Sequence, residues 1–318
     1  SNTTASNNTA VGYQAGYSNT TGTAINAFGI NALYSNTTGT SNSAFGGIHN
    51  GVINGALFAN TSGSYSVAIG QAALTNNTTG INVAIGDSVM ANNTTGSGNV
   101  AIGTFDGSTL PPLYYNTTGI NNAAVGDSSL SANTTGSYNT AIGGSALANN
   151  TTASNNTAVG FQAAYSNTTG TQNVAVGTVA LYTNSTGNNN SAVGRGALYY
   201  NTTGSSNTAM GPGALKSNTT GSANTGIGYQ ALCSNTTANY NTAVGYQAAY
   251  NNTTGGVTAF GQTALYSNTT GNFNTAVGGS ALYSNTTASN NTAVGYQAGY
   301  TNTGGTYLTA FGQYALKA

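Results

Sequence analysis

The sequence predicts an all-β protein: a parallel β-solenoid or β-roll of about eighteen coils, with one 17-residue repeat per coil. Three observations predict it. A unit of the form x-x-Asn-Thr-Ala-Val-Gly-x-x-Ala-Leu-x-x-Asn-Thr-Thr-Gly recurs along all 318 residues. Its seventh position is glycine in all eighteen units. Short apolar pairs return in every unit, so each unit is a module that needs its neighbours to bury its apolar residues.

The first element expected in each unit is a short strand at positions four to six, Thr-Ala-Val, bounded by Asn and Gly. Side chains four and six should point into the core and alternate with the Ala between them. A second extended piece is expected around the Leu at position eleven, which should also point inward. The Asn at position fourteen should stack on its counterparts in neighbouring coils and form an amide ladder.

The glycines at positions seven and seventeen are predicted to form the corners of each coil, because a need for positive φ or close backbone approach would recur at every turn. Position seventeen is Gly fourteen times and Ala four times. After each of these Ala residues, the next unit has a small residue followed by Tyr at positions eleven and twelve. This correlation suggests a variant coil, in which the missing Leu makes room for an aromatic ring. Representative corner residues are Gly12, Gly29, Gly160, Gly245 and Gly295.

The domain organisation expected is a single uncapped solenoid over residues 1–318, with loop insertions at 47–55 and 104–111. Both insertions follow the invariant glycine, so both loops should leave the same corner. Insertions in repeat arrays are either tolerated decoration or part of a binding face. Decoration is the favoured interpretation, and His49, Phe105 and Asp106 are the candidates for a specific contact in these loops.

The composition excludes several classes of function. Only six residues are charged, with three Lys or Arg, three Asp and no Glu. Three scattered bases are too few for nucleic-acid binding, and Cys233 and His49 are too far apart in sequence to suggest a metal site. Acid–base catalysis needs paired ionisable groups, so no enzyme, catalytic residue or cofactor is expected. No apolar run approaches the ~20 residues of a membrane-spanning helix.

Two recurring surface patterns have competing interpretations. Tyr is frequent at position twelve, as in Tyr182 and Tyr199, and should form an exposed aromatic stripe suited to bundling or adhesion. Asn-Thr-Thr matches the N-glycosylation pattern in almost every unit. The same residues are wanted for ladders and turns, so a structural role is favoured over a glycan.

The segments Ser66 to Gly70, Asn82 to Gly86 and Asn99 to Gly103 resemble the head repeats of trimeric autotransporter adhesins. The commoner form, at Asn8 to Ala15 and Asn291 to Ala298, is similar to repeat arrays of predicted phage tail fibres and secreted bacterial surface proteins. The resemblance implies a left-handed parallel β-roll, an extracellular or cell-surface location and three chains side by side. The chain differs in its somewhat longer repeat.

The function expected is that of a structural subunit in an extracellular fibre that assembles itself head to tail. The sequence starts and stops inside a repeat, so one end could complete the other at about 85 to 90 Å per molecule. The polymer seam would then comprise Ser1, Asn2, Thr3, Leu316, Lys317 and Ala318. The alternative is a trimeric adhesin head or phage fibre shaft that binds a cell surface, with glycans as partners. A minor alternative is ice binding by stacked Thr columns.

Overall fold

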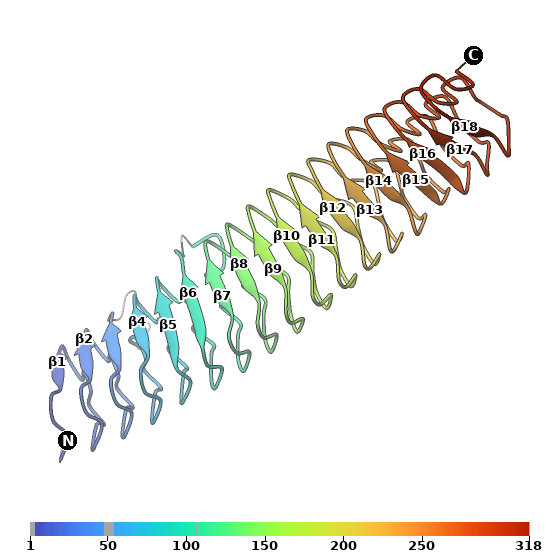
Figure 1. Cartoon of the computed structure of the whole chain (residues 1–318). Helices are drawn as coiled ribbons and strands as arrows, with labels where there is room; N and C mark the ends of the chain where they lie inside the picture. The colour runs from blue at the N-terminus through green and yellow to red at the C-terminus, as the bar shows by residue number, and fades with distance from the viewer. Residues whose placement is uncertain (1–3, 48–53, 106, 318) are drawn as a thin grey trace. The chain divides into compact units, whose positions relative to one another are not determined.

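The computed structural model describes residues 4–47, 54–105 and 107–317. The chain divides into two compact units, residues 1–161 and 162–318. The described residues of both units form short parallel strands and no helix, and each strand recurs after about one repeat (Figure 1). The predicted parallel β-solenoid with one 17-residue repeat per coil is therefore confirmed.

The described residues of the first unit form nine strands, each hydrogen-bonded in parallel to the next along the chain. Equivalent positions lie beside one another, so that Ala10 pairs with Ala27 and Ala27 with Ala44. The strands are β1 (Thr9–Val11), β2 (Asn26–Phe28), β3 (Ser43–Phe45), β4 (Val67–Ile69), β5 (Asn82–Ile85), β6 (Asn99–Ile102), β7 (Ala123–Val125), β8 (Thr140–Ile142) and β9 (Thr157–Val159).

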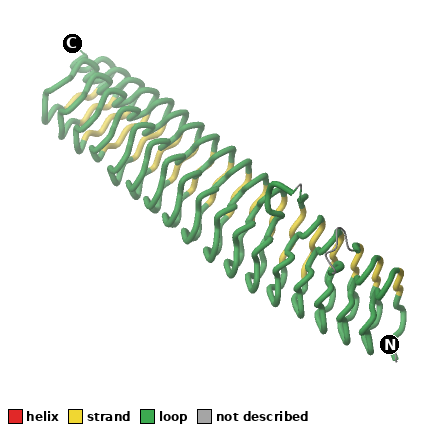
Figure 2. The backbone as a smooth tube through the Cα atoms, turned by 180° about the vertical axis from the view of Figure 1, so that it is seen from behind, coloured by secondary structure: helices red, strands yellow, loops and turns green. Residues whose placement is uncertain are grey.

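Within residues 162–317 the second unit forms nine strands with the same register, so that Ala192 pairs with Ala175 and Ala209. The strands are β10 (Val174–Val176), β11 (Ser191–Val193), β12 (Thr208–Met210), β13 (Thr225–Ile227), β14 (Thr242–Val244), β15 (Val257–Phe260), β16 (Asn274–Val277), β17 (Thr292–Val294) and β18 (Thr309–Phe311). Figure 2 shows that the rest of each coil is turn and loop.

The inward direction of the strand was predicted wrongly. In β11 the central Ala192 is fully buried, whereas Ser191 is half-buried and Val193 is exposed. The limited space inside the coil explains why position five points inward. Where Gly226 occupies position five, an added Cβ would lie 3.2 Å from Leu215 Cγ in the preceding coil. Ala192 is buried at this position in its own coil and the Cβ at Gly226 would already be in close contact, so the interior has no space for the larger side chains of positions four and six.

The Leu at position eleven points inward as predicted, but it does not belong to a strand. Leu198 is fully buried and has a φ of 52°. Its N–H donates to Ala214 O of the next coil at 3.0 Å. A left-handed conformation normally costs a non-glycine residue about 1–2 kcal/mol, so hydrogen bonding between coils and apolar burial must offset that cost. Each coil consequently has one strand instead of the two expected.

The predicted amide ladder at position fourteen is confirmed. Asn201 Nδ2 donates to Asn184 Oδ1 of the preceding coil at 2.8 Å and to Gly204 O of its own coil at 2.9 Å. Its Oδ1 accepts from Asn218 Nδ2 at 2.7 Å. Both amide hydrogens and the carbonyl oxygen are thus used, and the side chain is fully buried. This arrangement satisfies a buried polar group that would otherwise destabilise the core.

A second amide ladder, not predicted, runs along position three. Asn224 donates from Nδ2 to Asn207 Oδ1 at 3.1 Å and to Ala238 O at 2.8 Å. Asn235, at position fourteen, donates to the same Ala238 oxygen at 3.2 Å. The two ladders therefore meet on the backbone carbonyl of position seventeen. The bonds to Ala238 O show that Ala at this position supplies the same carbonyl, although a Cβ added at Gly204 would clash with Gly221 O.

The variant coil predicted from the Ala corners is not present. Tyr17, from such a coil, stacks on Tyr34 of a standard coil with ring centroids 5.3 Å apart. At position eight, Tyr246 of another such coil stacks on Tyr229 at 5.4 Å. Equivalent side chains thus point the same way in both kinds of coil, so the missing Leu does not redirect an aromatic ring.

The space left by a missing Leu is filled from the next coil. A Cβ added at Gly16 would lie 3.5 Å from Ile25 Cδ1, and one at Gly299 would lie 3.1 Å from Leu308 Cδ2. Ile25 and Leu308 occupy position three, where Asn is usual. The third large apolar residue at this position, Val257, also follows a coil with a small residue at position eleven. Core volume is therefore conserved at three of the four coils that lack Leu, whereas the coil after Ala164 has the usual Asn173.

Candidate functional surfaces

The glycines at position seven combine an unusual backbone conformation with close packing between coils. Gly12, Gly29, Gly160, Gly245 and Gly295 have φ values of +130°, +123°, +134°, +139° and +135°. A Cβ on Gly12 would lie 2.7 Å from the carbonyl carbon of Gly29, and a Cβ on Gly245 would lie 2.5 Å from Gly261 O. Glycine at this position therefore meets both a conformational and a steric requirement.

The tyrosines at position twelve form stacked columns, which are half-buried instead of an exposed stripe. Tyr182 lies between Tyr165 and Tyr199, with ring centroids 5.3 and 5.0 Å away and interplanar angles of 9° and 14°. Coil stacking spaces successive rings at about the distance that offset aromatic pairs prefer. Tyr182 and Tyr199, proposed from the sequence as surface contacts, thus bury much of their ring area against each other.

Position six presents a column of apolar side chains on the outer face of the sheet. Within each unit this column is Val, Ile, Phe or Met in every coil. The following members have exposed fractions between 36% and 43%: Phe45, Ile69, Ile102, Val125, Ile142, Val193, Met210, Ile227, Phe260 and Val277. A continuous apolar column of this kind indicates a surface that can associate with another apolar surface.

The two threonine columns have different environments. Thr202, at position fifteen, is half-buried, and its Oγ1 donates to Thr219 O of the next coil at 3.1 Å. Thr203, at position sixteen, is exposed. Only the second column therefore faces solvent with its hydroxyl groups. The adjacent Asn201 is fully buried with its amide nitrogen used twice, so a glycan on it would break the ladder.

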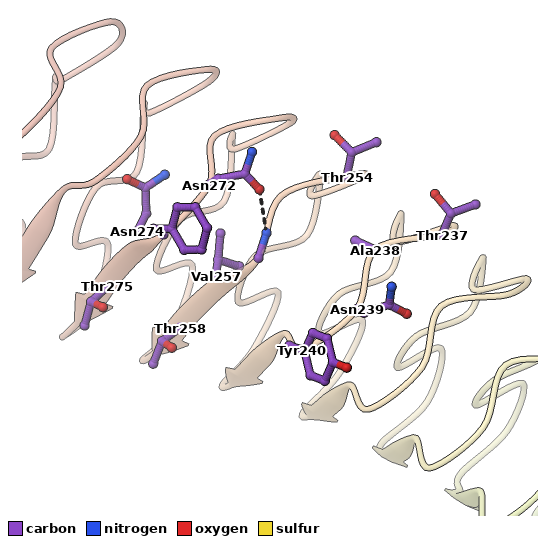
Figure 3. A pocket seen from close by; sticks show the side chains of 12 residues that line it. Thr237, Ala238, Asn239, Tyr240, Thr254, Val257, Thr258, Asn272, Asn274 and Thr275 are labelled. Atoms are coloured by element: carbon purple, nitrogen blue, oxygen red, sulfur yellow. Dashed lines mark hydrogen bonds between the residues drawn. The ribbon is translucent and has the colours of Figure 1, made fainter.

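A hollow in the second unit lies beside β15 and β16 and has a volume of about 650 Å³. It forms where one coil is a residue short, because Thr242 pairs with Thr258, sixteen residues later. Gly256 lies in this coil, and its N–H donates to Asn272 Oδ1 at 3.0 Å (Figure 3). Tyr240 and Phe273 line the same hollow from the preceding and following coils.

The chemistry of this hollow is neutral and aromatic. Tyr240 and Phe273 are 81% and 76% exposed, the highest values among the large apolar side chains apart from Tyr307. Thr and Asn residues supply the polar groups around them, and none of the twelve lining residues is charged. The hollow offers ring faces and hydrogen-bonding groups to an uncharged ligand, and it holds no pair of ionisable groups for acid–base chemistry.

The loop and seam residues named from the sequence are only partly described. Phe105 is 42% exposed, and the neighbouring Thr104 Oγ1 donates to Asp127 Oδ1 at 3.3 Å. The insertion at 47–55 leaves its corner closed, since Ala56 N–H still donates to Gly46 O at 3.3 Å. His49, Asp106, Ser1, Asn2, Thr3 and Ala318 lie outside the described residues.

The remaining seam residues lie on the C-terminal coil. Leu316 is 57% exposed, and Lys317 Nζ lies 4.4 Å from the ring centroid of Tyr314. Lys317 O also accepts a hydrogen bond from Thr301 Oγ1 at 2.9 Å. Lys317 occupies position twelve, the position of Tyr300 in the preceding coil.

The sequence contained signals for features that sequence reasoning missed. Counting the period shows two sixteen-residue coils, residues 81–96 and 256–271, and the hollow lies at the second. Aligning position three shows an Asn column as regular as that of position fourteen. Aligning position nine shows glycine in two consecutive units only, Gly196 and Gly213. Departures from the repeat thus mark the places where one coil differs chemically from its neighbours.

No protein-family model and no characterised protein sequence matches this chain. Across the described ranges, no helix is long and apolar enough to cross a membrane. The same ranges hold no group of three or more His, Cys, Asp or Glu side chains placed to bind a metal ion. Functional inference therefore depends on the geometry of the coils and their surfaces.

Proposed function

We propose that this protein is a structural element of an extracellular fibre, in which the coils of one molecule stack on those of the next. The observation that carries the proposal is the uniformity of the interface between coils. The Nδ2 groups of Asn207, Asn224 and Asn241 each donate to Oδ1 of the Asn in the preceding coil at 3.0–3.1 Å. Oδ1 of Asn207 and of Asn224 also accepts the backbone N–H of the Asn in the next coil, at 3.0 and 2.9 Å. Coils with Asn at position three therefore present complementary edges to one another.

The composition and the hydrogen bonding support an extracellular mechanical role. With three bases in 318 residues, trypsin-like proteases find few sites. The core is held by ladders that repeat in every coil, so load along the stack would be shared among equivalent bonds. A head-to-tail contact that does not close into a ring produces a fibre.

Electron microscopy and fibre diffraction of the purified protein test this function. We expect unbranched fibres with a meridional reflection near ~4.8 Å, the spacing of parallel strands stacked along the axis. Discrete particles at every protein concentration would refute head-to-tail assembly.

A substitution at the edge of β18 sharpens the test. In the preceding coil, Thr292 N–H donates to Leu308 O at 2.8 Å, so the equivalent N–H of Thr309 faces the coil that would follow. Thr309→Pro removes this donor and should shorten or abolish the fibres. Thr309→Val retains the N–H and serves as the matched control. Fibres of unchanged length from Thr309→Pro would contradict stacking at this edge.

A second candidate function is a shaft or adhesin head built from several chains side by side. The apolar column at position six favours it, because the column offers each chain a continuous surface to cover. The resemblance of the Val-Ala-Ile-Gly segments to trimeric adhesin heads points the same way. Light scattering of the wild type and of the double variant Val193→Thr, Met210→Gln would measure the number of chains per particle. A defined oligomer that the substitutions dissociate favours this function. An unchanged mass in the variant opposes it.

A further inference from the structure

A smaller hollow of about 320 Å³ in the second unit concentrates most of the positive charge of the protein. Arg195 and Lys216, two of its three basic residues, both line this hollow. Tyr199, Tyr200 and Tyr229 line it as well. The hollow lies on consecutive coils around β11, β12 and β13, away from the neutral hollow at Gly256.

Two glycines line this hollow at a position where the backbone conformation does not require glycine. Gly196 and Gly213, at position nine, have φ values of +65° and +68°. Val179 and Gln230 occupy the same position in the flanking coils with φ values of 50° and 52°, so the conformation does not require glycine. A Cβ added at Gly196 would meet no atom within 4 Å. Gly196 therefore leaves free volume beside the cations, whereas a Cβ added at Gly213 would lie 3.3 Å from Gln230 Cγ.

The positive charge in the hollow has no internal counterion. Residues 162–318 contain no Asp and no Glu, so no carboxylate side chain of this unit can neutralise Arg195 or Lys216. Both side chains are exposed. A guanidinium and an ammonium facing one small space form a favourable site for an anionic group, with the guanidinium able to bind a carboxylate or sulfate through two parallel hydrogen bonds.

The tyrosines that line the hollow indicate a ligand with a ring and hydroxyl groups in addition to its anionic group. Tyr200 and Tyr229 are 48% and 46% exposed, so they offer ring faces and hydroxyl groups to a ligand. Tyr199 holds the neighbouring Tyr200 ring edge-on, with centroids 4.6 Å apart and an interplanar angle of 74°. The volume is at the small end for ligand pockets, which suits a single ring.

We propose that this hollow binds an acidic sugar residue, with Arg195 and Lys216 on its carboxylate or sulfate group and the tyrosines against its ring and hydroxyl groups. The proposal does not depend on fibre formation, since every residue that it uses comes from consecutive coils of one chain. It gives the protein a recognition site in addition to a structural role.

Calorimetric titration with glucuronic-acid and sulfated disaccharides, and with their neutral analogues, tests the proposal. We expect the acidic sugars to bind and their affinity to fall several-fold between about 50 and 500 mM salt, because added ions screen the contact. The neutral analogues should bind at least tenfold more weakly. Comparison of the carboxylated with the sulfated disaccharide identifies which anionic group the site prefers.

Three substitutions locate the binding. Arg195→Gln and Lys216→Gln should each weaken it about tenfold or more, whereas Lys317→Gln, which removes the third base, should leave it unchanged. Gly196→Gln should abolish binding by filling the hollow, with the melting temperature preserved because Gln230 adopts the same conformation at this position. Equal loss in the Lys317 variant, unchanged binding in the Gly196 variant, or equal affinity for free sulfate and for the disaccharides would overturn the proposal.

Discussion

Replacing Asn201 with Ala tests whether the amide ladder stabilises the coils. The substitution removes the donor to Asn184 Oδ1 and the acceptor for Asn218 Nδ2, which lie 2.8 and 2.7 Å from Asn201. Gly204 O keeps a second donor, Asn190 Nδ2 at 2.8 Å. The oxygen of Asn184 and one amide hydrogen of Asn218 are then left buried without these partners.

The expected magnitude follows from these two groups. A buried polar group left unsatisfied costs about 1–3 kcal/mol, so two of them should lower the local free energy of opening by about 2–6 kcal/mol. Since every 1.4 kcal/mol is a factor of ten, the coils around position 201 should open roughly 30-fold to 20,000-fold more often. Stability in a repeat array is local, so the effect should decline within a few coils.

Amide hydrogen exchange measured by mass spectrometry is the assay, because it reports opening coil by coil where a single melting curve does not. Peptides covering residues 184–221 should exchange faster in the variant, and peptides several coils away should not. Thr203→Ala is the matched control, since Thr203 is exposed and lies in the same turn.

The variant Asn201→Asp separates a ladder from a local turn. Aspartate retains the turn preference of asparagine but cannot donate to Asn184 Oδ1, so it should be at least as harmful as Ala. Exchange unchanged by Asn201→Asp, or equal rates in the Asn201→Ala and Thr203→Ala variants, would refute the reasoning.

Three further predictions concern single positions. Gly211→Ala should accelerate exchange across its coil by more than tenfold, because its φ is +129° and the added Cβ would meet the next coil's backbone, whereas Gly196→Ala should change it less than tenfold, because the added Cβ meets no atom within 4 Å. Gly16→Leu and Ile25→Asn should each lower the melting temperature, and the double variant should recover most of the loss; additive losses would contradict volume exchange between coils. Burial raises the pKa of the Cys233 thiol, so the folded state keeps its proton where the unfolded thiol, of pKa about 8.5, loses it. The free energy of unfolding should therefore fall as pH rises above about 8.5, and Cys233→Ala should flatten this fall in denaturant titrations.

The repeat allowed much of the interior to be predicted because identical positions stack in parallel coils. Periodicity alone places each Asn at position fourteen above its counterpart, and Asn201 shows the resulting ladder with all its groups used. The burial of Leu198 follows from the same logic. The candidate hollows were harder to predict, because they arise where single coils depart from the repeat, at Gly256 and at Gly196.

The sequence by itself determined the period, the parallel register and the residues that stack, since these depend only on which positions recur. The tertiary structure decided which way each position faces. The pattern Thr-Ala-Val has apolar groups on both faces, so the sequence alone allows either face to point inward. The narrow interior accepts the methyl group of Ala192 and therefore selects the face with the smaller side chain. The left-handed φ of Leu198 was likewise decided by the coil, because its N–H must reach the next coil while its side chain fills the core.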